Sequence, residues 1–234
     1  KRQRDLYKFI HDQTLRLAGQ GLTPNEIAEQ IQLPPSLAPY FGNRGYYGTV
    51  QHNAKAVYQW YFGWYDGNPA NLNPLPPEES SQRWVDALGG TKNVQLMAEE
   101  AFEQGEYRWA AELLNHAVFA NPDNQAARED LARTYDQLGY QAESGPWRDI
   151  YLSGAHELRH GPISQGSNLA DAIGLLREVS LDQIFDTLAT RLNAEEAIDA
   201  DTVVEFDFTD RGESYLLWIE NSVLHHRKGN PEEV

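Results

Sequence analysis

A change in the spacing of apolar residues near residue 200 limits the folds that this chain can adopt. Before it, apolar residues recur every three or four positions, as Leu6 and Ile10 do, which is the spacing of an amphipathic helix. After it the period is two, because Val204, Phe206 and Phe208 alternate with polar residues. The sequence therefore predicts a mostly α-helical bundle followed by a partial α+β domain with an antiparallel sheet.

The helical part contains one segment that fits the 34-residue period of a tetratricopeptide repeat. Ala98 recurs as Ala132, and Gly105 recurs as Gly139, one period further on. Small residues allow paired helices to approach closely, and the glycines are expected to form the turns between them. Because a stacked array needs about three repeats to be stable, the prediction is a bundle with tetratricopeptide-like hairpins rather than a long solenoid.

A domain boundary is expected after Gly161-Pro162, which divides the chain into 1–163 and 164–234. Beyond it, the pattern predicts a helix over 169–179 and a second helix that Ser180 caps. Turns at 210–212 and 221–222 then separate three strands. The chain opens without a helix cap and stops just after a strand-like stretch, so we expect a fragment truncated at both ends.

Composition removes several classes of function. The 234 residues carry a net charge of −16, which repels phosphate backbones and argues against nucleic acid as a partner. The chain has no cysteine, so disulfide frameworks and thiolate zinc sites are excluded, although the compartment stays open. No apolar run reaches the ~18 residues of a membrane span, and none is predicted.

The glycine-punctuated loop over 41–49 leads into a helix expected over 50–65 and is the main candidate site. Thr49 is placed at the N-cap and His52 in the first turn, next to Arg44. A helix start with free N–H groups, an arginine and an imidazole can bind an anion, and Tyr46 and Tyr47 can donate hydrogen bonds. The alternative is a tight turn that delivers an aromatic-rich helix to the core or to an interface.

Three motifs that contain histidine invite a catalytic or metal-binding interpretation. His156-Glu157-Leu158-Arg159-His160 matches the H-E-x-x-H pattern of zinc hydrolases, with Glu178 as a distant third ligand, but it also fits a solvated helix end. His11 and Asp12 are neighbours that point about 100° apart on a helix, so they are not expected to face each other. His225-His226 alternates across a strand and is not a chelating pair by itself. The sequence has no G-x-S-x-G motif.

Over essentially its whole length, the chain resembles the zinc-dependent alkylsulfatases of the metallo-β-lactamase superfamily. The residues that carry the resemblance are 3–16, 45–50, 52–59, 63–70 and 208–215. The helical part resembles the dimerisation domain of that family, and the following part resembles the start of its sterol-carrier-protein-like domain. The family's H-x-H-x-D-H zinc motif does not occur in this sequence.

The resemblance implies that this chain is the non-metal portion of an enzyme that hydrolyses alkyl sulfates to alcohol and sulfate. Zinc would be bound by an absent metallo-β-lactamase-like domain, and the isolated chain would form a homodimer, bind no metal and be inactive. The resemblance further implies a periplasmic or secreted protein. Its site residues would be His52 as the catalytic group and five substrate-binding residues, namely Arg44, Tyr46, Tyr47, Thr49 and Asn53. The alternative is a stand-alone helical-repeat module that binds another protein.

Overall fold

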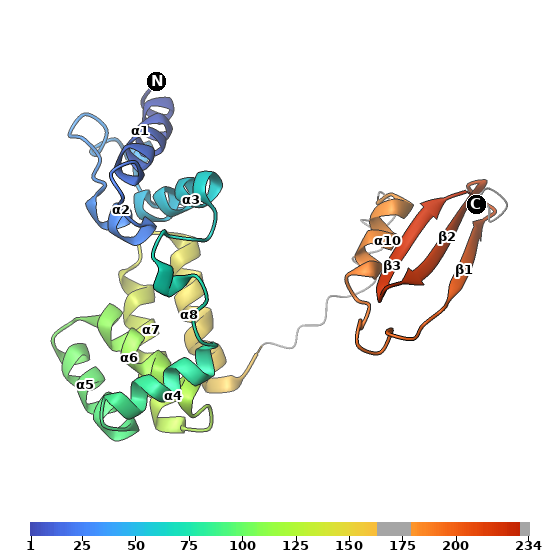
Figure 1. Ribbon diagram of the computed structural model, residues 1–234. Coiled ribbons are helices and arrows are strands. Elements are labelled where there is room, and N and C mark those ends of the chain that lie inside the picture. Colours follow the sequence, from blue (N-terminus) through green and yellow to red (C-terminus); the bar gives the residue numbers. More distant parts are fainter. Residues whose placement is uncertain (163–178, 230–234) are drawn as a thin grey trace. The chain divides into compact units, whose positions relative to one another are not determined.

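The structure is a computed structural model that describes residues 1–162 and 179–229. The chain divides into two compact units, Lys1–Ile163 and Ser164–Val234. The described part of the first unit is helical, and that of the second combines one α-helix with a three-stranded antiparallel sheet (Figure 1). The prediction of a mostly helical chain with a small α+β part is confirmed.

The first three helices form a cluster with its own core. These helices are α1 (Arg2–Ala18), α2 (Pro24–Gln30) and α3 (Val50–Phe62). α2 begins at a capping box, in which the Glu26 N–H donates to Thr23 Oγ1 and the Thr23 N–H donates to Glu26 Oε2. Ile10, Ile27 and Ala54 bring one buried residue from each helix into the same cluster. The 3₁₀ turn η1 (Phe41–Asn43) contacts α1.

α3 is three residues shorter than the sequence pattern predicted. It ends at Phe62 because Gly63 takes a φ of +76°, a left-handed conformation that a glycine adopts easily. Of its aromatic residues, Tyr58 is buried, whereas Trp60 is 84% exposed. The short turn η2 (Pro69–Asn71) follows. The aromatic run over 58–65 therefore lies mostly on the surface of this unit.

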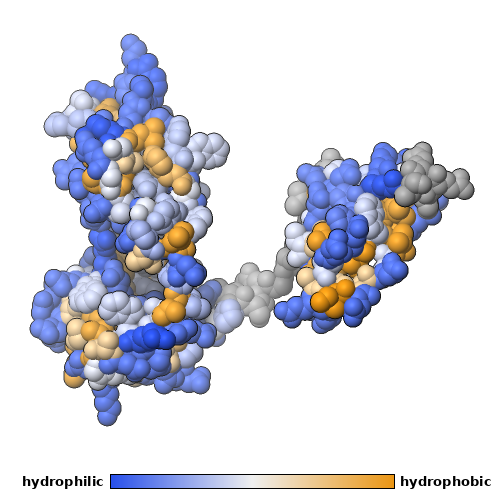
Figure 2. Space-filling view, in the orientation of Figure 1, coloured by the Kyte–Doolittle hydropathy of each residue, from blue (hydrophilic) through white to orange (hydrophobic). Residues whose placement is uncertain are grey.

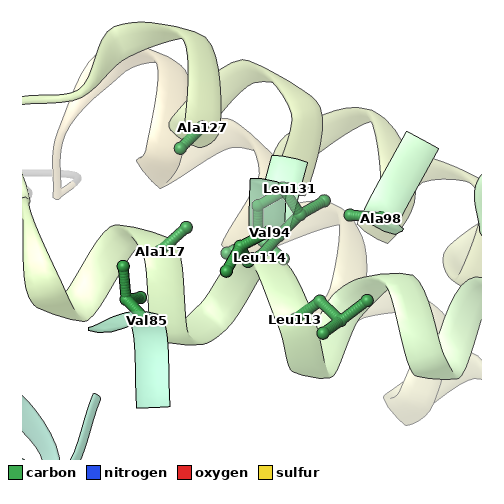
Figure 3. Close-up of a cluster of buried hydrophobic side chains, with 8 residues drawn as sticks. All are labelled: Val85, Val94, Ala98, Leu113, Leu114, Ala117, Ala127 and Leu131. Atoms are coloured by element: carbon green, nitrogen blue, oxygen red, sulfur yellow. The ribbon is translucent and has the colours of Figure 1, made fainter. Parts of the chain in front are cut away.

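Five further helices form the second cluster of the first unit: α4 (Pro77–Ala87), α5 (Thr91–Glu103), α6 (Tyr107–Ala120), α7 (Gln125–Gln141) and α8 (Gly145–His160). Successive helices from α5 to α8 pack on each other, and α4 packs on α6. Alanine and leucine side chains fill the space between them (Figure 3), for example Ala98, Leu113 and Leu131. Small residues at these positions allow the helix axes to approach closely.

The two glycines of the repeat pattern have different roles. Gly105 forms the turn between α5 and α6, with a φ of +78°, as predicted. Gly139 was also expected to form a turn, and that prediction was wrong, because Gly139 lies inside α7. A Cβ at this position would lie 2.9 Å from Leu152 of α8. Gly139 therefore allows α8 to pack closely, and spacing alone does not distinguish a turn glycine from a packing glycine.

The described part of the second unit contains α10 (Leu181–Ala189), β1 (Val203–Phe208), β2 (Glu213–Glu220) and β3 (Val223–Lys228), with strand order β1-β2-β3. Ser180 and Gln183 form the predicted capping box. The turn between β2 and β3 holds Asn221 at φ 53° and Ser222 at φ 60°, as a type I′ hairpin requires. The helix expected over 169–179 lies almost entirely outside the described residues.

Phe185 of α10 is the centre of the core in this unit. Its ring lies 5.1 Å from that of Tyr215, 5.6 Å from that of His226 and 5.7 Å from that of Phe206. In contrast, β1 is largely exposed, and apolar side chains are visible over this strand and the loop before it (Figure 2). Among the helices of the described residues, none has both the length and the apolar character needed to span a bilayer.

Candidate functional site

The loop over 44–49 leads directly into α3, as the sequence predicted. Thr49 is the N-cap residue, and its Oγ1 accepts a hydrogen bond from the His52 N–H at 2.9 Å. This cap fixes His52 in the first turn, where the Val50 and Gln51 N–H groups have no acceptor within the helix. The start of α3 therefore presents backbone donors and an imidazole side by side.

The start of α8 holds this loop through its backbone, although the two segments are almost 100 residues apart in the sequence. The Gly145 N–H donates to the Tyr46 carbonyl at 2.8 Å. The Ser144 hydroxyl, whose residue is buried, donates to the Tyr47 carbonyl. These contacts satisfy loop carbonyls that have no partner in regular secondary structure. They fix the backbone of the loop at both of its tyrosines.

His52 also has a partner at the start of α8. The Trp147 Nε1–H group donates to His52 Nδ1 at 2.9 Å, and the two rings meet edge-on at a centroid distance of 6.1 Å. Trp147 is half-buried, whereas His52 is exposed. We call Ser144, Gly145 and Trp147, together with Glu143, the α8 clamp.

Arg44 is not the free cation that the loop sequence suggested. Its Nη2 forms a salt bridge with Glu143 of the α8 clamp, and its guanidinium lies 5.1 Å from the centre of the Tyr46 ring. Because a guanidinium has five N–H donors, this single ion pair leaves other donors for an anion. Arg44 therefore serves as a link between the loop and α8 in addition to any contact with a ligand.

The remaining predicted site residues differ in their surroundings. Asn53 packs against Gly48, where an added Cβ would lie 2.9 Å from Asn53 Oδ1, so a larger residue at position 48 would force the amide to shift. The Tyr47 side chain is 81% exposed and is free to meet another surface or a ligand. Tyr46 is half-covered by Arg44 and by Phe41, whose ring centre lies 5.2 Å away.

A cleft of about 900 Å³ lies behind the loop, between the α1–α3 cluster and the α6–α8 helices. Arg44 and Thr49 line it, and so does Trp147, whereas His52, Asn53 and the two tyrosines do not. Its charged lining residues are three cations and two anions, namely Arg44, Lys55, Arg108, Glu29 and Glu143. The structure thus brings the predicted residues together on the loop and the first turn of α3, but only Arg44 and Thr49 among them line the cleft.

The prediction that His11 and Asp12 do not face each other was wrong. His11 Nδ1 lies 2.9 Å from Asp12 Oδ1, and His11 Nε2 lies 2.9 Å from the Tyr61 hydroxyl. Rotation about the side-chain bonds brings the imidazole and the carboxylate together despite the 100° between their Cα–Cβ directions. Hydrogen bonds from Lys8 and His11 lower the pKa of Asp12. This exposed group connects α1 to α3.

The other histidine motifs do not form a metal site within the described residues. His156 and His160 lie on one face of α8 with ring centres 4.6 Å apart. Glu178, the third ligand considered for them, lies outside the described residues. In 1–162 and 179–229, no three His, Asp or Glu side chains are grouped closely enough to hold a metal ion. His225 stacks on Trp218 and His226 faces Phe185, on opposite sides of the sheet.

Two family models match this chain. The model described as alkyl sulfatase dimerisation matches residues 23–161, and the model described as alkyl sulfatase C-terminal matches residues 170–234. The first match includes the whole loop, the start of α3 and the α8 clamp. The chain therefore belongs to the alkylsulfatase family.

Known relatives agree with this assignment. The chain is 47% identical to a linear primary-alkylsulfatase of Pseudomonas sp. over 97% of its length and 47% identical to the alkyl/aryl-sulfatase BDS1 of Saccharomyces cerevisiae over 98%. These matches cover 34% and 35% of the relatives, so the chain spans about a third of their length. The structure of the stereoselective inverting sec-alkylsulfatase Pisa1 from Pseudomonas sp. is 43% identical, with a TM-score of 0.91, over 99% of this chain and 37% of that one.

Proposed function

We propose that this chain is the part of an alkyl sulfate hydrolase that provides self-association and completes the substrate pocket around His52. The reaction converts an alkyl sulfate and water into an alcohol and sulfate. The observation that carries this proposal is the loop before α3, whose backbone and whose histidine are both held by the α8 clamp. A loop fixed in this way can keep its donors aimed at a substrate without reorganising when the substrate binds.

Each residue of the loop and of the start of α3 has its own part in binding a sulfate group. His52 touches the sulfate or its leaving oxygen, and the N–H groups at the start of α3 add donors of the kind that favour anions. Arg44 contributes the guanidinium donors that Glu143 leaves free, and its positive charge suits a sulfate oxygen. Tyr46, Tyr47 and Asn53 supply further hydrogen-bond donors, and Thr49 keeps the helix start in place.

The metal chemistry belongs to a different part of the enzyme in this proposal. Zinc is held by a metallo-β-lactamase-like domain joined to this chain. The substrates are alkyl sulfates of the detergent type, and the compartment is periplasmic or extracellular. In this proposal the contribution of the helical unit is to bind and orient the substrate.

Self-association is the second part of the proposal, with a homodimer formed through the helical unit. The match to a dimerisation model and the exposed aromatic residues of α3 support it. The hairpins α5–α6 and α7–α8 are tetratricopeptide-like in this interpretation, since successive helices pack side by side. The unit with β1 to β3 is the start of a sterol-carrier-protein-like domain. Family membership favours these roles over a stand-alone adaptor, which would remain monomeric in sedimentation velocity.

The direct test is His52→Ala in the longer enzyme that contains this sequence. We expect turnover of dodecyl sulfate to fall by about 100-fold, as for the loss of one group that stabilises developing charge, with zinc content unchanged. His225→Ala, in the other unit, is the matched control and should retain turnover. Unchanged turnover in His52→Ala would remove His52 from the site and with it the proposed pocket.

A further inference from the structure

The hydrogen bond between Trp147 and His52 determines which imidazole nitrogen carries the proton. An indole Nε1–H group is a donor and has no acceptor capacity. Because Trp147 donates to His52 Nδ1 at 2.9 Å, Nδ1 must be the unprotonated nitrogen of a neutral imidazole. The proton then lies on Nε2, the nitrogen on the opposite side of the ring. Unlike a hydroxyl or an amide in this position, the indole leaves no ambiguity about the direction of the bond.

The rest of the α8 clamp holds the indole in place. The Trp147 N–H donates to Ser144 Oγ at 3.4 Å, so Trp147 stands in the first turn of α8 directly above its capped start. Ser144 and Gly145 in turn hold the loop that leads to His52. The edge-on contact, with 61° between the ring planes, is the arrangement that points an indole N–H at a ring nitrogen rather than stacking the two rings.

We propose that Trp147 is a positioning residue that keeps His52 in the Nε2–H tautomer, so that the imidazole presents an N–H donor to an anionic oxygen of the substrate. This inference rests on the proposed function for the role of His52, but the tautomer itself is a property of this chain. Neither family match nor the sequence pattern assigns a role to Trp147. An N–H donor is the group that a sulfate oxygen, which only accepts hydrogen bonds, would require.

The first measurement uses this chain with ¹⁵N-labelled histidine and tryptophan in NMR at neutral pH. The expected result is a His52 Nδ1 shift typical of an unprotonated ring nitrogen, together with a scalar coupling from Trp147 Nε1 across the hydrogen bond. A protonated Nδ1 in the wild-type chain would overturn the proposal. Because a free neutral imidazole also favours the Nε2–H form, the coupling is the part of this result that tests Trp147, and it needs no variant. Absence of the coupling would overturn the proposal even if a substitution at Trp147 prevents folding.

The second measurement compares Trp147→Phe with Trp109→Phe, which changes the same type of ring at an exposed position of α6. Loss of one ordinary hydrogen bond should raise the ratio of the Nδ1–H to the Nε2–H tautomer of His52 about fivefold in Trp147→Phe. Trp109→Phe should leave it unchanged. Identical His52 tautomer ratios in the wild-type chain and Trp147→Phe would overturn the positioning role.

Turnover in the longer enzyme separates this inference from the proposed function. We expect Trp147→Phe to lower kcat for dodecyl sulfate severalfold while KM changes little, since the alkyl chain and the ion-paired Arg44 are untouched. If the tautomer shifts but kcat does not, His52 is not acting through Nε2–H and the inference about the substrate fails. If His52→Ala is itself fully active, the proposed function fails, whereas the tautomer result stands.

Discussion

The two units stabilise their cores in different ways. In the helical unit, eight buried alanine, leucine and valine side chains from α4 to α7 share the packing (Figure 3). In the described part of the C-terminal unit, Phe185 alone contacts aromatic rings from all three strands. Burial spread over many small contacts tolerates a local loss, whereas burial centred on one ring does not.

The largest expected effect is that of Phe185→Ala. Removing this side chain should cost about 4 kcal/mol, which is close to the whole stability of a domain of this size. ¹⁵N NMR spectra should lose the dispersed signals of 179–229 while those of the helical unit persist. Phe206→Ala, at a partly exposed position of β1, is the matched control and should keep the unit folded. If Phe185→Ala retained the dispersed signals, the core of this unit would not depend on a single ring, and the two units would not differ in this way.

A smaller effect is expected for Leu113→Ala in the helical unit. Leu113 is 1% exposed, so the cavity should lower the free energy of unfolding of this unit by about 3 kcal/mol. The unit should nevertheless stay folded at 25 °C, because the remaining contacts of the cluster persist. Thermal unfolding followed by circular dichroism at 222 nm measures the shift. The control is Leu96→Ala, which truncates a 70% exposed side chain of α5. It should change the free energy of unfolding by less than about 0.5 kcal/mol.

The smallest effect is a gain in stability from Ser222→Gly. Ser222 has a φ of 60°. This conformation destabilises a residue with a Cβ by about 1 kcal/mol, whereas glycine adopts it without that steric penalty. The substitution should therefore stabilise the unit of β1 to β3 by about 0.5–1 kcal/mol. The urea midpoint of this unit, followed by the fluorescence of Trp218, measures the change. A decrease in the urea midpoint would contradict this prediction and show that the serine side chain stabilises the turn.

Local signals in the sequence predicted the elements of this protein well. The cap at Ser180, the N-cap at Thr49 and the turn at 221–222 all occur as expected, because each depends on residues within a few positions of one another. The exceptions are instructive. Gly139 looked like a turn residue but allows two helices to pack, and α3 ends at Gly63 instead of continuing to Tyr65.

The candidate site was predictable only in part. The loop over 44–49 and the position of His52 follow from local patterns. The α8 clamp does not, although Ser144-Gly145-Pro146 is recognisable as a helix start, because its partners are 95 to 99 residues away and two of its four contacts are made with backbone carbonyls. Backbone acceptors leave no mark in the sequence that would identify which distant residue binds them.

The sequence by itself determined the order of helices and strands, the capped starts of α2, α3 and α10, and an anion-suited loop in a strongly acidic chain. These properties arise from periodicity, from residue conformation and from charge, all of which act over short stretches. Only the tertiary structure decided that Glu143 neutralises part of the charge of Arg44 and that Trp147 holds His52. Those contacts exist because the start of α8 lies beside the start of α3 and the loop before it, and the position of α8 depends on packing within the helical unit.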